Sequence, residues 1–244
     1  MFLDAGGVIV LPHRDLVAGA LHRIGIEIDP DAVPRAHYRA VRAFDRAGGS
    51  YPAALFPQLG IMSGQTAEAL ATWERLADRS RSGEILWSEP TPGALETIAA
   101  LRRRRIPVVI VTNSDGHAEE NLRHCGFDDV PVIDSQIVGS EKPDVRIFEA
   151  ALARAGTRVG TDTRIGTDTR AGAGARTGTG TRTGTGIRAT EVVHVGDTLS
   201  ADVAGARAAG ITPIHFDPLR ACRAADHRHL RTLRGIWQHM HAAP

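Results

Sequence analysis

The chain has little of several residue types that mark particular classes of protein. It contains a single lysine, Lys142, two cysteines, Cys125 and Cys222, and only 5% aromatic residues. Two cysteines are too few for a disulfide framework, so we expect a reducing compartment. No apolar run reaches the roughly 18 residues that a membrane-spanning helix needs, and no basic segment followed by a long apolar stretch begins the chain. We therefore expect a soluble, cytoplasmic protein with no membrane partner.

The chain also lacks an excess of charge of either sign. Its 29 basic and 28 acidic residues leave a formal net charge of +1, which gives no reason to expect nucleic acid as a partner. What the chain does have is length and apolar content, with 244 residues of which 42% are hydrophobic. That is enough for one large α/β domain, or for a core domain with a smaller accessory domain.

The first candidate functional residue lies within the first ten positions. A short apolar run leads into Asp4, which is followed by Gly6 and Gly7 and then by a second apolar run over 8–11. A buried strand that ends on a carboxylate and turns on glycines places that carboxylate at the carboxyl edge of a sheet, where ligands bind in open α/β folds. Because a typical strand has about five or six residues, the short run before Asp4 leads us to expect that the natural chain begins upstream of Met1.

Residues 13–87 show helical periodicity and no convincing strand. Apolar residues recur at helical spacing over about 13–24, 30–47 and 66–79, and a shorter segment lies at 52–59. This pattern predicts a helical bundle inserted after the first strand.

From residue 88 the pattern alternates between helices and apolar strands. We predict helices over 94–104, 118–124, 145–155 and 202–209, and strands over 106–111, 130–133, 136–138, 191–195 and 211–216. The strand over 106–111 is apolar on both faces, as expected at the centre of a parallel sheet. The sequence therefore predicts an α/β core from residues 1–12 and 88–244.

Residues 157–189 differ in character from both regions. The hexapeptide at 161–166 recurs in modified form at 167–172, and that at 176–181 recurs at 182–187. Almost none of these side chains could fill a core, so we interpret the tract as a disordered expansion of one surface loop. Six-residue repeats also occur in β-helices, but four imperfect copies are too few to form one.

Polar residues follow the predicted strands at four places. They are Asp4, then Thr112 with Asn113, then Lys142 in a loop before a helix, then Asp197 with Asp202. Adjacent parallel strands would bring these residues to one crevice. Such a cluster suits phosphoryl transfer, because a carboxylate can attack phosphorus and other carboxylates can hold Mg²⁺. Lys142 and the Thr112 hydroxyl would then hold the phosphoryl oxygens.

The four segments together resemble an ordered set of family motifs. Asp-Ala-Gly-Gly-Val at 4–8, Val-Thr-Asn-Ser at 111–114, Glu-Lys-Pro-Asp at 141–144 and Val-Gly-Asp-Thr-Leu-Ser-Ala-Asp at 195–202 are similar to the motifs of the haloacid dehalogenase-like (HAD) hydrolases. The helical insert after the first motif lies where members of that family carry an α-helical cap. The resemblance implies an α/β fold, with a Rossmann-like parallel sheet core and a small α-helical cap domain over 13–87.

The resemblance also implies roles for individual residues. Asp4 would be the nucleophile, and Thr112 and Lys142 would complete the catalytic set. A small phosphorylated substrate would be held by Thr112, Asn113, Lys142 and Gly7. Mg²⁺ would be held by Asp4, Asp197, Asp202 and the carbonyl group of Gly6. The expected activity is that of a Mg²⁺-dependent phosphatase with an aspartyl-phosphate intermediate.

One position departs from the phosphatase pattern. Phosphatases of this family usually carry a second aspartate two residues after the nucleophile as general acid and base, and here that position is Gly6. Such assistance contributes about 10²–10⁴-fold to a rate. One hypothesis is that His13 substitutes for the missing acid. Two alternatives are a catalytically weak or inactive protein that binds phosphate and metal, and a metal-free dehalogenase-type hydrolase.

Simpler interpretations exist for the same residues. Thr112 could cap the helix that follows it, Lys142 could form a surface pair with Glu141, and Asp197 and Asp202 could be acidic residues at a helix start. The carboxyl-terminal histidines at 227, 229, 239 and 241 are of a metal-ligating type. Their apolar neighbours at 230, 233, 236, 237 and 240 favour instead a terminal helix that docks on the core.

Overall fold

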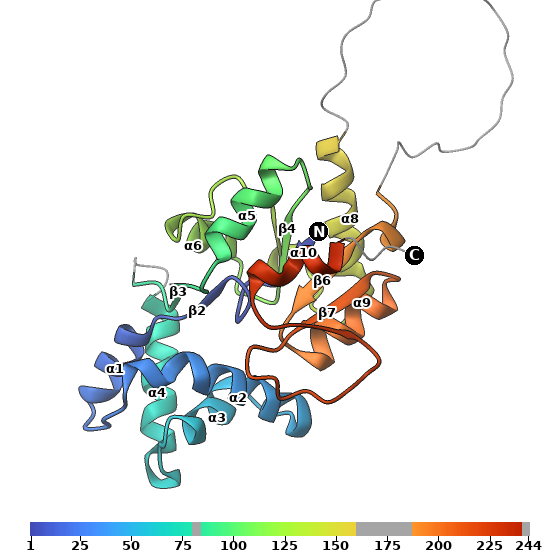
Figure 1. Cartoon of the computed structure of the whole chain (residues 1–244). Helices are drawn as coiled ribbons and strands as arrows, with labels where there is room; N and C mark the ends of the chain where they lie inside the picture. Colours follow the sequence, from blue (N-terminus) through green and yellow to red (C-terminus); the bar gives the residue numbers. More distant parts are fainter. Residues whose placement is uncertain (80–83, 160–186, 241–244) are drawn as a thin grey trace, which may run out of the picture.

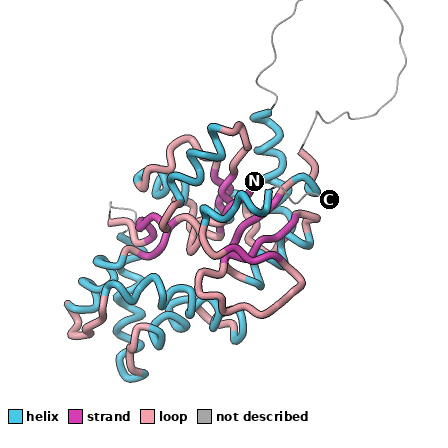
Figure 2. Tube along the Cα trace, in the orientation of Figure 1, coloured by secondary structure: helices cyan, strands magenta, loops and turns pink. Residues whose placement is uncertain are grey.

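The computed structural model describes residues 1–79, 84–159 and 187–240, and a six-stranded sheet runs through the larger part of it (Figures 1 and 2). The strand order is β5-β4-β1-β6-β7-β8, and every neighbouring pair is parallel. The strands are β1 (Phe2–Leu3), β4 (Val109–Thr112), β5 (Val132–Asp134), β6 (Val193–Gly196), β7 (Thr212–Phe216) and β8 (Arg228–Leu230). This topology confirms the predicted α/β fold with a Rossmann-like parallel sheet.

The central strand β1 shows why the sheet is buried on both faces. Successive side chains of a strand point to opposite faces, and here Leu3 packs with Ile110 on one face while Phe2 packs with Val109 and Val111 on the other. Both faces need helical cover. One is covered by α5 (Ala94–Arg103) and the turn η6 (Leu233–Ile236), and the other by α8 (Val145–Val159) and α9 (Ala204–Ala208).

Four helices form a second unit with its own hydrophobic cluster, drawn in blue and cyan in Figure 1. They are α1 (Arg14–His22), α2 (Val33–Ala47), α3 (Tyr51–Gln58) and α4 (Thr66–Arg79). Apolar residues of α2 at positions 33, 36 and 40 are buried there, as helical spacing requires. We call residues 13–79 and 84–87 the helical unit.

A two-stranded antiparallel ribbon joins the helical unit to the sheet. It consists of β2 (Val10–Pro12) and β3 (Trp87–Pro90), which flank the helices in sequence. Trp87 packs against the hydrophobic clusters of both units. The sequence did not predict this ribbon, because strands of three and four residues carry too little periodicity to be recognised.

Two other predictions differ from the structure. The strand predicted over 136–138 is a one-turn helix, α7 (Ser135–Val138), because the Asp134 carboxylate accepts a hydrogen bond from the Gln136 N–H at 2.9 Å and starts a helical turn. Helix α6 (Ala118–His124) is as predicted. The tail is not one helix, since it contains β8, η6 and the short helix α10 (Trp237–Met240), but Leu233 and Ile236 are buried in the core.

Residues 160–186 of the repeat tract lie outside the described residues. No described helix has the length and apolar character needed to cross a membrane.

Candidate active site

The carboxyl ends of β1, β4 and β6 bring the predicted residues together at one edge of the sheet. Asp4 directly follows β1, and its N–H donates to the Val195 carbonyl in β6 at 2.8 Å. Thr112 ends β4, and Asp197 follows β6. All three side chains are buried, and they line a cavity of about 470 Å³ together with Gly6, Asn113 and Lys142. The residues predicted at the strand ends therefore line one cavity.

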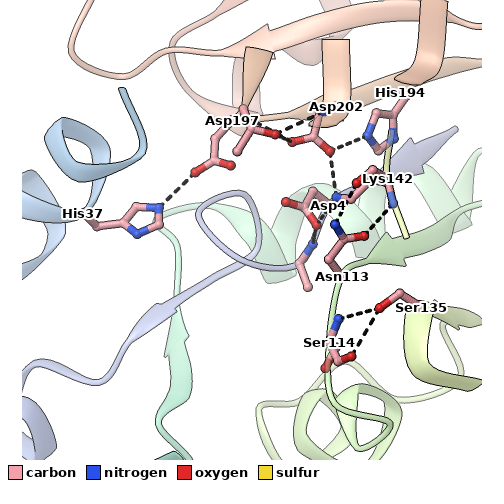
Figure 3. A network of polar contacts seen from close by, with 11 residues as sticks. Asp4, His37, Asn113, Ser114, Ser135, Lys142, His194, Asp197 and Asp202 are labelled. Atoms are coloured by element: carbon pink, nitrogen blue, oxygen red, sulfur yellow. Dashed lines mark hydrogen bonds and ion pairs between the residues drawn. The ribbon is translucent and has the colours of Figure 1, made fainter. Parts of the chain in front are cut away.

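Lys142 is the centre of the polar network in Figure 3. Its Nζ lies 2.7 Å from Asp4 Oδ1 and 2.7 Å from Asp202 Oδ1, and its side chain is 3% exposed. Burial lowers the pKa of Lys142, but the Asp202 and Asp4 carboxylates outweigh burial and hold that pKa above its ordinary value. The only lysine of the chain is therefore a buried, permanently charged cation and not part of a surface pair with Glu141.

Asn113 fixes the loop that carries Lys142. The Lys142 N–H donates to Asn113 Oδ1 at 2.8 Å, and Asn113 Nδ2 donates to the Lys142 carbonyl at 3.0 Å. This reciprocal pair uses one N–H donor and one acceptor site of the Asn113 amide and fixes its orientation. The Asn113 side chain therefore positions the loop that carries Lys142.

Asp202 accepts hydrogen bonds on both of its oxygens. Oδ1 accepts from Lys142 and from His194 Nε2 at 2.8 Å, and Oδ2 accepts from the Thr198 hydroxyl at 2.5 Å and from the Thr198 N–H at 3.1 Å. A carboxylate offers about four lone-pair sites, and all of them are occupied here. Burial raises the pKa of Asp202, but Lys142 and His194 outweigh burial and keep that pKa below its usual range. Asp202 is thus an ionised group that holds Lys142.

Asp4 and Asp197 have the opposite electrostatic character. Burial, together with the neighbouring carboxylates, raises the pKa of Asp4 to about 7 and raises that of Asp197 well above its usual value. Donor atoms of Asp4, Asp197 and Asp202 lie within 4.8 Å of one another. Three buried carboxylates share one lysine, so the cluster needs further positive charge when it is ionised. Hard oxygen donors in such a group suit Mg²⁺.

A side chain would be disfavoured for different reasons at Gly7 and at Gly6, the two glycines that follow Asp4. Gly7 has φ of +73°, and a Cβ there would lie 1.9 Å from Asp197 Oδ2 and 2.4 Å from His37 Nε2. A side chain would therefore fill the space beside the carboxylates. A Cβ on Gly6 would lie 3.3 Å from the Trp87 ring. The ring of Trp87 thus covers the position where the family's phosphatases usually carry their acid and base.

The helical unit contributes residues that the sequence did not reveal. His37 of α2 reaches Asp197, with Nε2 2.9 Å from Oδ2 (Figure 3). Its Nδ1 lies 2.8 Å from the Tyr51 hydroxyl. Burial lowers the pKa of His37 to about 3, so the ring is neutral. Its only signal in the sequence is a histidine within an apolar helical stripe. His13 is not among the residues that line the cavity.

Comparisons with known proteins identify the family of the chain. A family model described as haloacid dehalogenase-like hydrolase matches residues 1–210. Ribulose-1,5-bisphosphate 5-phosphatase from Halopiger xanaduensis is 29% identical over 161 residues, which are 62% of this chain and 55% of that protein. The match therefore spans about half the length of that relative.

Two solved structures share the fold. A HAD-hydrolase from Bacillus subtilis, described as bound to magnesium, superposes with a TM-score of 0.60 at 18% identity and covers 98% of this chain and 97% of its own. A HAD-superfamily hydrolase of subfamily IA from Geobacter sulfurreducens superposes with a TM-score of 0.57 at 16% identity and covers 98% and 94%. At these identities the likeness shows the fold alone.

Proposed function

Because the chain belongs to the haloacid dehalogenase-like hydrolases, we propose that this hydrolase is a Mg²⁺-dependent phosphatase of a small phosphorylated metabolite. The observation that carries the proposal is the buried contact of Asp4 with Lys142 beside Asp197. That contact gives a nucleophile, a cation and a further carboxylate in one cavity. We also propose that the helical unit acts as a cap, because its His37 lies against the site.

Asp4 is the proposed nucleophile, and its contacts select the attacking oxygen. Its Oδ1 accepts from the Ala5 N–H at 2.8 Å and pairs with Lys142 Nζ at 2.7 Å. Both contacts are on Oδ1, which leaves Oδ2 to attack phosphorus. The new O–P bond forms as the bond from phosphorus to the leaving oxygen breaks, and water then hydrolyses the aspartyl-phosphate. Lys142 stabilises the negative charge on the transferring group.

Asp4, Asp197 and the carbonyl group of Gly6 are the proposed ligands of Mg²⁺. When bound, the ion would neutralise the phosphate and orient it for in-line attack. Asp202 was predicted to be a further ligand, but its oxygens already accept four hydrogen bonds within the protein. We therefore assign Asp202 to holding Lys142 in place. Thr112, Asn113 and Gly7 are the proposed additional contacts of the substrate, beside Lys142.

The site has no evident general acid, and this absence favours a second candidate function. The position two residues after the nucleophile is Gly6, and the Trp87 ring covers it. His37 is neutral, and its contacts with Asp197 and the Tyr51 hydroxyl occupy both ring nitrogens, so it does not replace the missing acid. The enzyme should therefore prefer esters with good leaving groups. The second candidate is a protein that binds phosphate and metal with little turnover.

Hydrolysis of a panel of phosphomonoesters, measured with and without Mg²⁺, tests the proposal. The panel should run from p-nitrophenyl phosphate to sugar phosphates, and it includes ribulose 1,5-bisphosphate because the Halopiger relative carries that name. Mg²⁺-dependent turnover that falls steeply with leaving-group pKa supports a phosphatase without a strong acid. Binding of Mg²⁺ and phosphate without turnover supports the second candidate. Hydrolysis of haloacids that resists EDTA would support dehalogenase-type chemistry instead.

A further inference from the structure

A second group of metal-ligating side chains lies on the loop between β7 and β8. It contains His215 in β7, Cys222 in the loop, and His227 and His229 at the start of β8. One donor atom of each residue lies within 4.8 Å of the corresponding atoms of the other three. We propose that these four residues, which we call the imidazole–thiolate cluster, bind one Zn²⁺ ion that fixes this loop. The proposal is independent of the phosphatase assignment.

The second ring nitrogen of each histidine already has an oxygen partner. His215 Nε2 lies 3.2 Å from the Asp197 carbonyl, His227 Nδ1 lies 2.8 Å from Asp226 Oδ1, and His229 Nε2 lies 2.9 Å from the Ala224 carbonyl. Carbonyl and carboxylate oxygens only accept, so these nitrogens carry the protons. In the neutral form of each ring, the remaining nitrogen is a lone-pair donor. Metal-bound histidines characteristically have such outer partners, which fix the tautomer and the orientation of the ring.

His215 supplies an independent sign that a ligand is expected. Its Nδ1 is buried and has no hydrogen-bond partner, and the residue is 8% exposed. A buried polar atom without a partner costs free energy, and a metal ion would satisfy it. Burial lowers the pKa of His215, which keeps its ring in the neutral form that binds metals.

One donor pair already has the separation of a tetrahedral zinc site. Zn–S and Zn–N bonds of about 2.3 and 2.0–2.1 Å imply that a sulfur and a nitrogen ligand lie about 3.6 Å apart. Cys222 Sγ and His227 Nε2 are 3.6 Å apart. The other pairs lie within 4.8 Å and would close by at most about 1.5 Å on binding.

Asp217 holds the loop in the conformation that presents Cys222. Its carboxylate accepts from the Ala221 and Cys222 N–H groups, each at 2.9 Å, and its own N–H donates to the Leu230 carbonyl at 2.8 Å. The turn also requires Arg220 to adopt a positive φ of 55°. The thiol is thus placed by the fold of the loop, and it is not a random neighbour of the histidines.

The donor types select the metal and the role. Three imidazoles and one thiolate are nitrogen and sulfur ligands, which suit Zn²⁺ and not Mg²⁺. Four protein ligands complete a tetrahedral ion, so the site is structural and not open to substrate. The same loop lines a second cavity that also includes Asp197, and His215 contacts the Asp197 carbonyl. Zinc would therefore fix a loop that is linked through His215 to Asp197 of the active site.

The first test is the zinc content of the full chain, purified without a nickel column and analysed by plasma mass spectrometry. We expect about one zinc ion per chain. Cys222→Ser and His229→Ala should lose most of it, while Cys125→Ser, at the cysteine outside the cluster, and Asp4→Asn should keep it. Far-UV circular dichroism confirms that each variant is folded. Zinc that is absent from the parent, or that is unchanged in folded Cys222→Ser, would overturn the proposal.

Replacement of zinc by Co²⁺ tests the ligand set directly. A tetrahedral cobalt site with one thiolate should give intense visible bands and a sulfur-to-cobalt charge-transfer band in the near ultraviolet. In Cys222→Ser the charge-transfer band should disappear, and in Cys125→Ser it should remain. A weak octahedral spectrum in the parent, or a charge-transfer band that follows Cys125, would contradict the Cys–His₃ site.

Discussion

Two candidate metal sites lie close together in this molecule, and they are built on opposite principles. The carboxylate cluster of Asp4, Asp197 and Asp202 offers hard oxygens around one buried lysine, and Asp4, Asp197 and Lys142 line a cavity. The imidazole–thiolate cluster offers four nitrogen and sulfur donors, which are enough to complete a tetrahedral ion. Donor chemistry assigns the first to Mg²⁺ and reaction, and the second to Zn²⁺ and structure. Loss of turnover and loss of zinc should therefore be separable by substitution.

The largest effect is expected at the nucleophile. Asp4→Asn keeps the shape of the side chain but removes the attacking charge, so kcat should fall by about 10³-fold or more. Zinc content should not change, which separates the two sites. Steady-state hydrolysis of p-nitrophenyl phosphate measures the loss, with Asp78→Asn on the exposed face of α4 as the matched control. Equal turnover in both variants would rule out Asp4.

Removal of Lys142 should affect both stability and turnover. Lys142→Met leaves Asp4 and Asp202 without their buried partner, and breaking a buried pair costs about 3–5 kcal/mol. Urea unfolding should show a loss of that size, and Mg²⁺ should restore part of it. Arg146→Met, at an exposed pair with Asp144, should change stability by less than about 1 kcal/mol. An equally small loss in Lys142→Met would contradict the buried network.

Substitution at Gly6, which the Trp87 ring covers, should restore a general acid to the active site. Gly6→Asp alone is crowded by the Trp87 ring, whereas Gly6→Asp with Trp87→Leu has room for an acid. The double variant should hydrolyse esters with poor leaving groups about 10²-fold faster than Trp87→Leu alone. Gly6→Asn with Trp87→Leu is the matched control and should show no gain. If the Asn and Asp variants behave alike, the missing acid does not limit turnover.

The pH dependence should report on Asp4. Burial raises its pKa from 3.8 to about 7, and only the ionised form attacks, so kcat/KM at low Mg²⁺ should rise about tenfold per pH unit below pH 7. Saturating Mg²⁺ favours the ionised form and should move this limb to lower pH. A pH profile at two Mg²⁺ concentrations tests the shift, and an acid limb that is independent of Mg²⁺ would contradict it.

The same shift has a consequence for folding. The raised pKa means that the folded state binds the Asp4 proton more tightly than the unfolded chain. This group therefore stabilises the metal-free protein below about pH 4, and the contribution is lost as pH rises toward 7. Mg²⁺ should stabilise the protein more at pH 7 than at pH 5, and thermal melts with and without the ion measure the difference.

The smallest effect on turnover is expected from the zinc site. Removal of zinc with 1,10-phenanthroline, which leaves Mg²⁺ in solution, should lower Tm by about 5–10 °C. The Tm of Cys222→Ser should already be lower and should not respond. Mg²⁺-dependent kcat should persist within about one order of magnitude, because the zinc ligand His215 reaches Asp197 only at its backbone carbonyl. Complete loss of turnover on zinc removal would break the distinction between the sites.

The two clusters also differ in how far the sequence predicts them. Asp4, Thr112 and Asp197 directly follow apolar strands, and parallel strands end at one edge, so their meeting follows from local pattern and topology. Lys142 could be placed only by its motif. His37 could not be placed at all, because its contact with Asp197 joins residues 160 positions apart and depends on how the helical unit docks.

The members of the imidazole–thiolate cluster could not be predicted from the histidine-rich tail alone. The pattern grouped His227 and His229 with the two histidines that follow, yet their partners are His215 and Cys222. These meet because β8 pairs in parallel with β7, with His215 opposite His229. A three-residue strand has almost no periodic signal, so that pairing was not predictable from the chain.

The most direct test of the phosphatase assignment is chemical trapping of the aspartyl-phosphate. The enzyme is quenched with acid during turnover with Mg²⁺, reduced with borohydride and digested, and the amino-terminal peptide is sequenced by mass spectrometry. Reduction of an acyl phosphate converts aspartate to homoserine, so homoserine is expected at position 4 and should depend on both substrate and Mg²⁺. Homoserine at another aspartate, or an unmodified Asp4 in an enzyme that turns over, would contradict it.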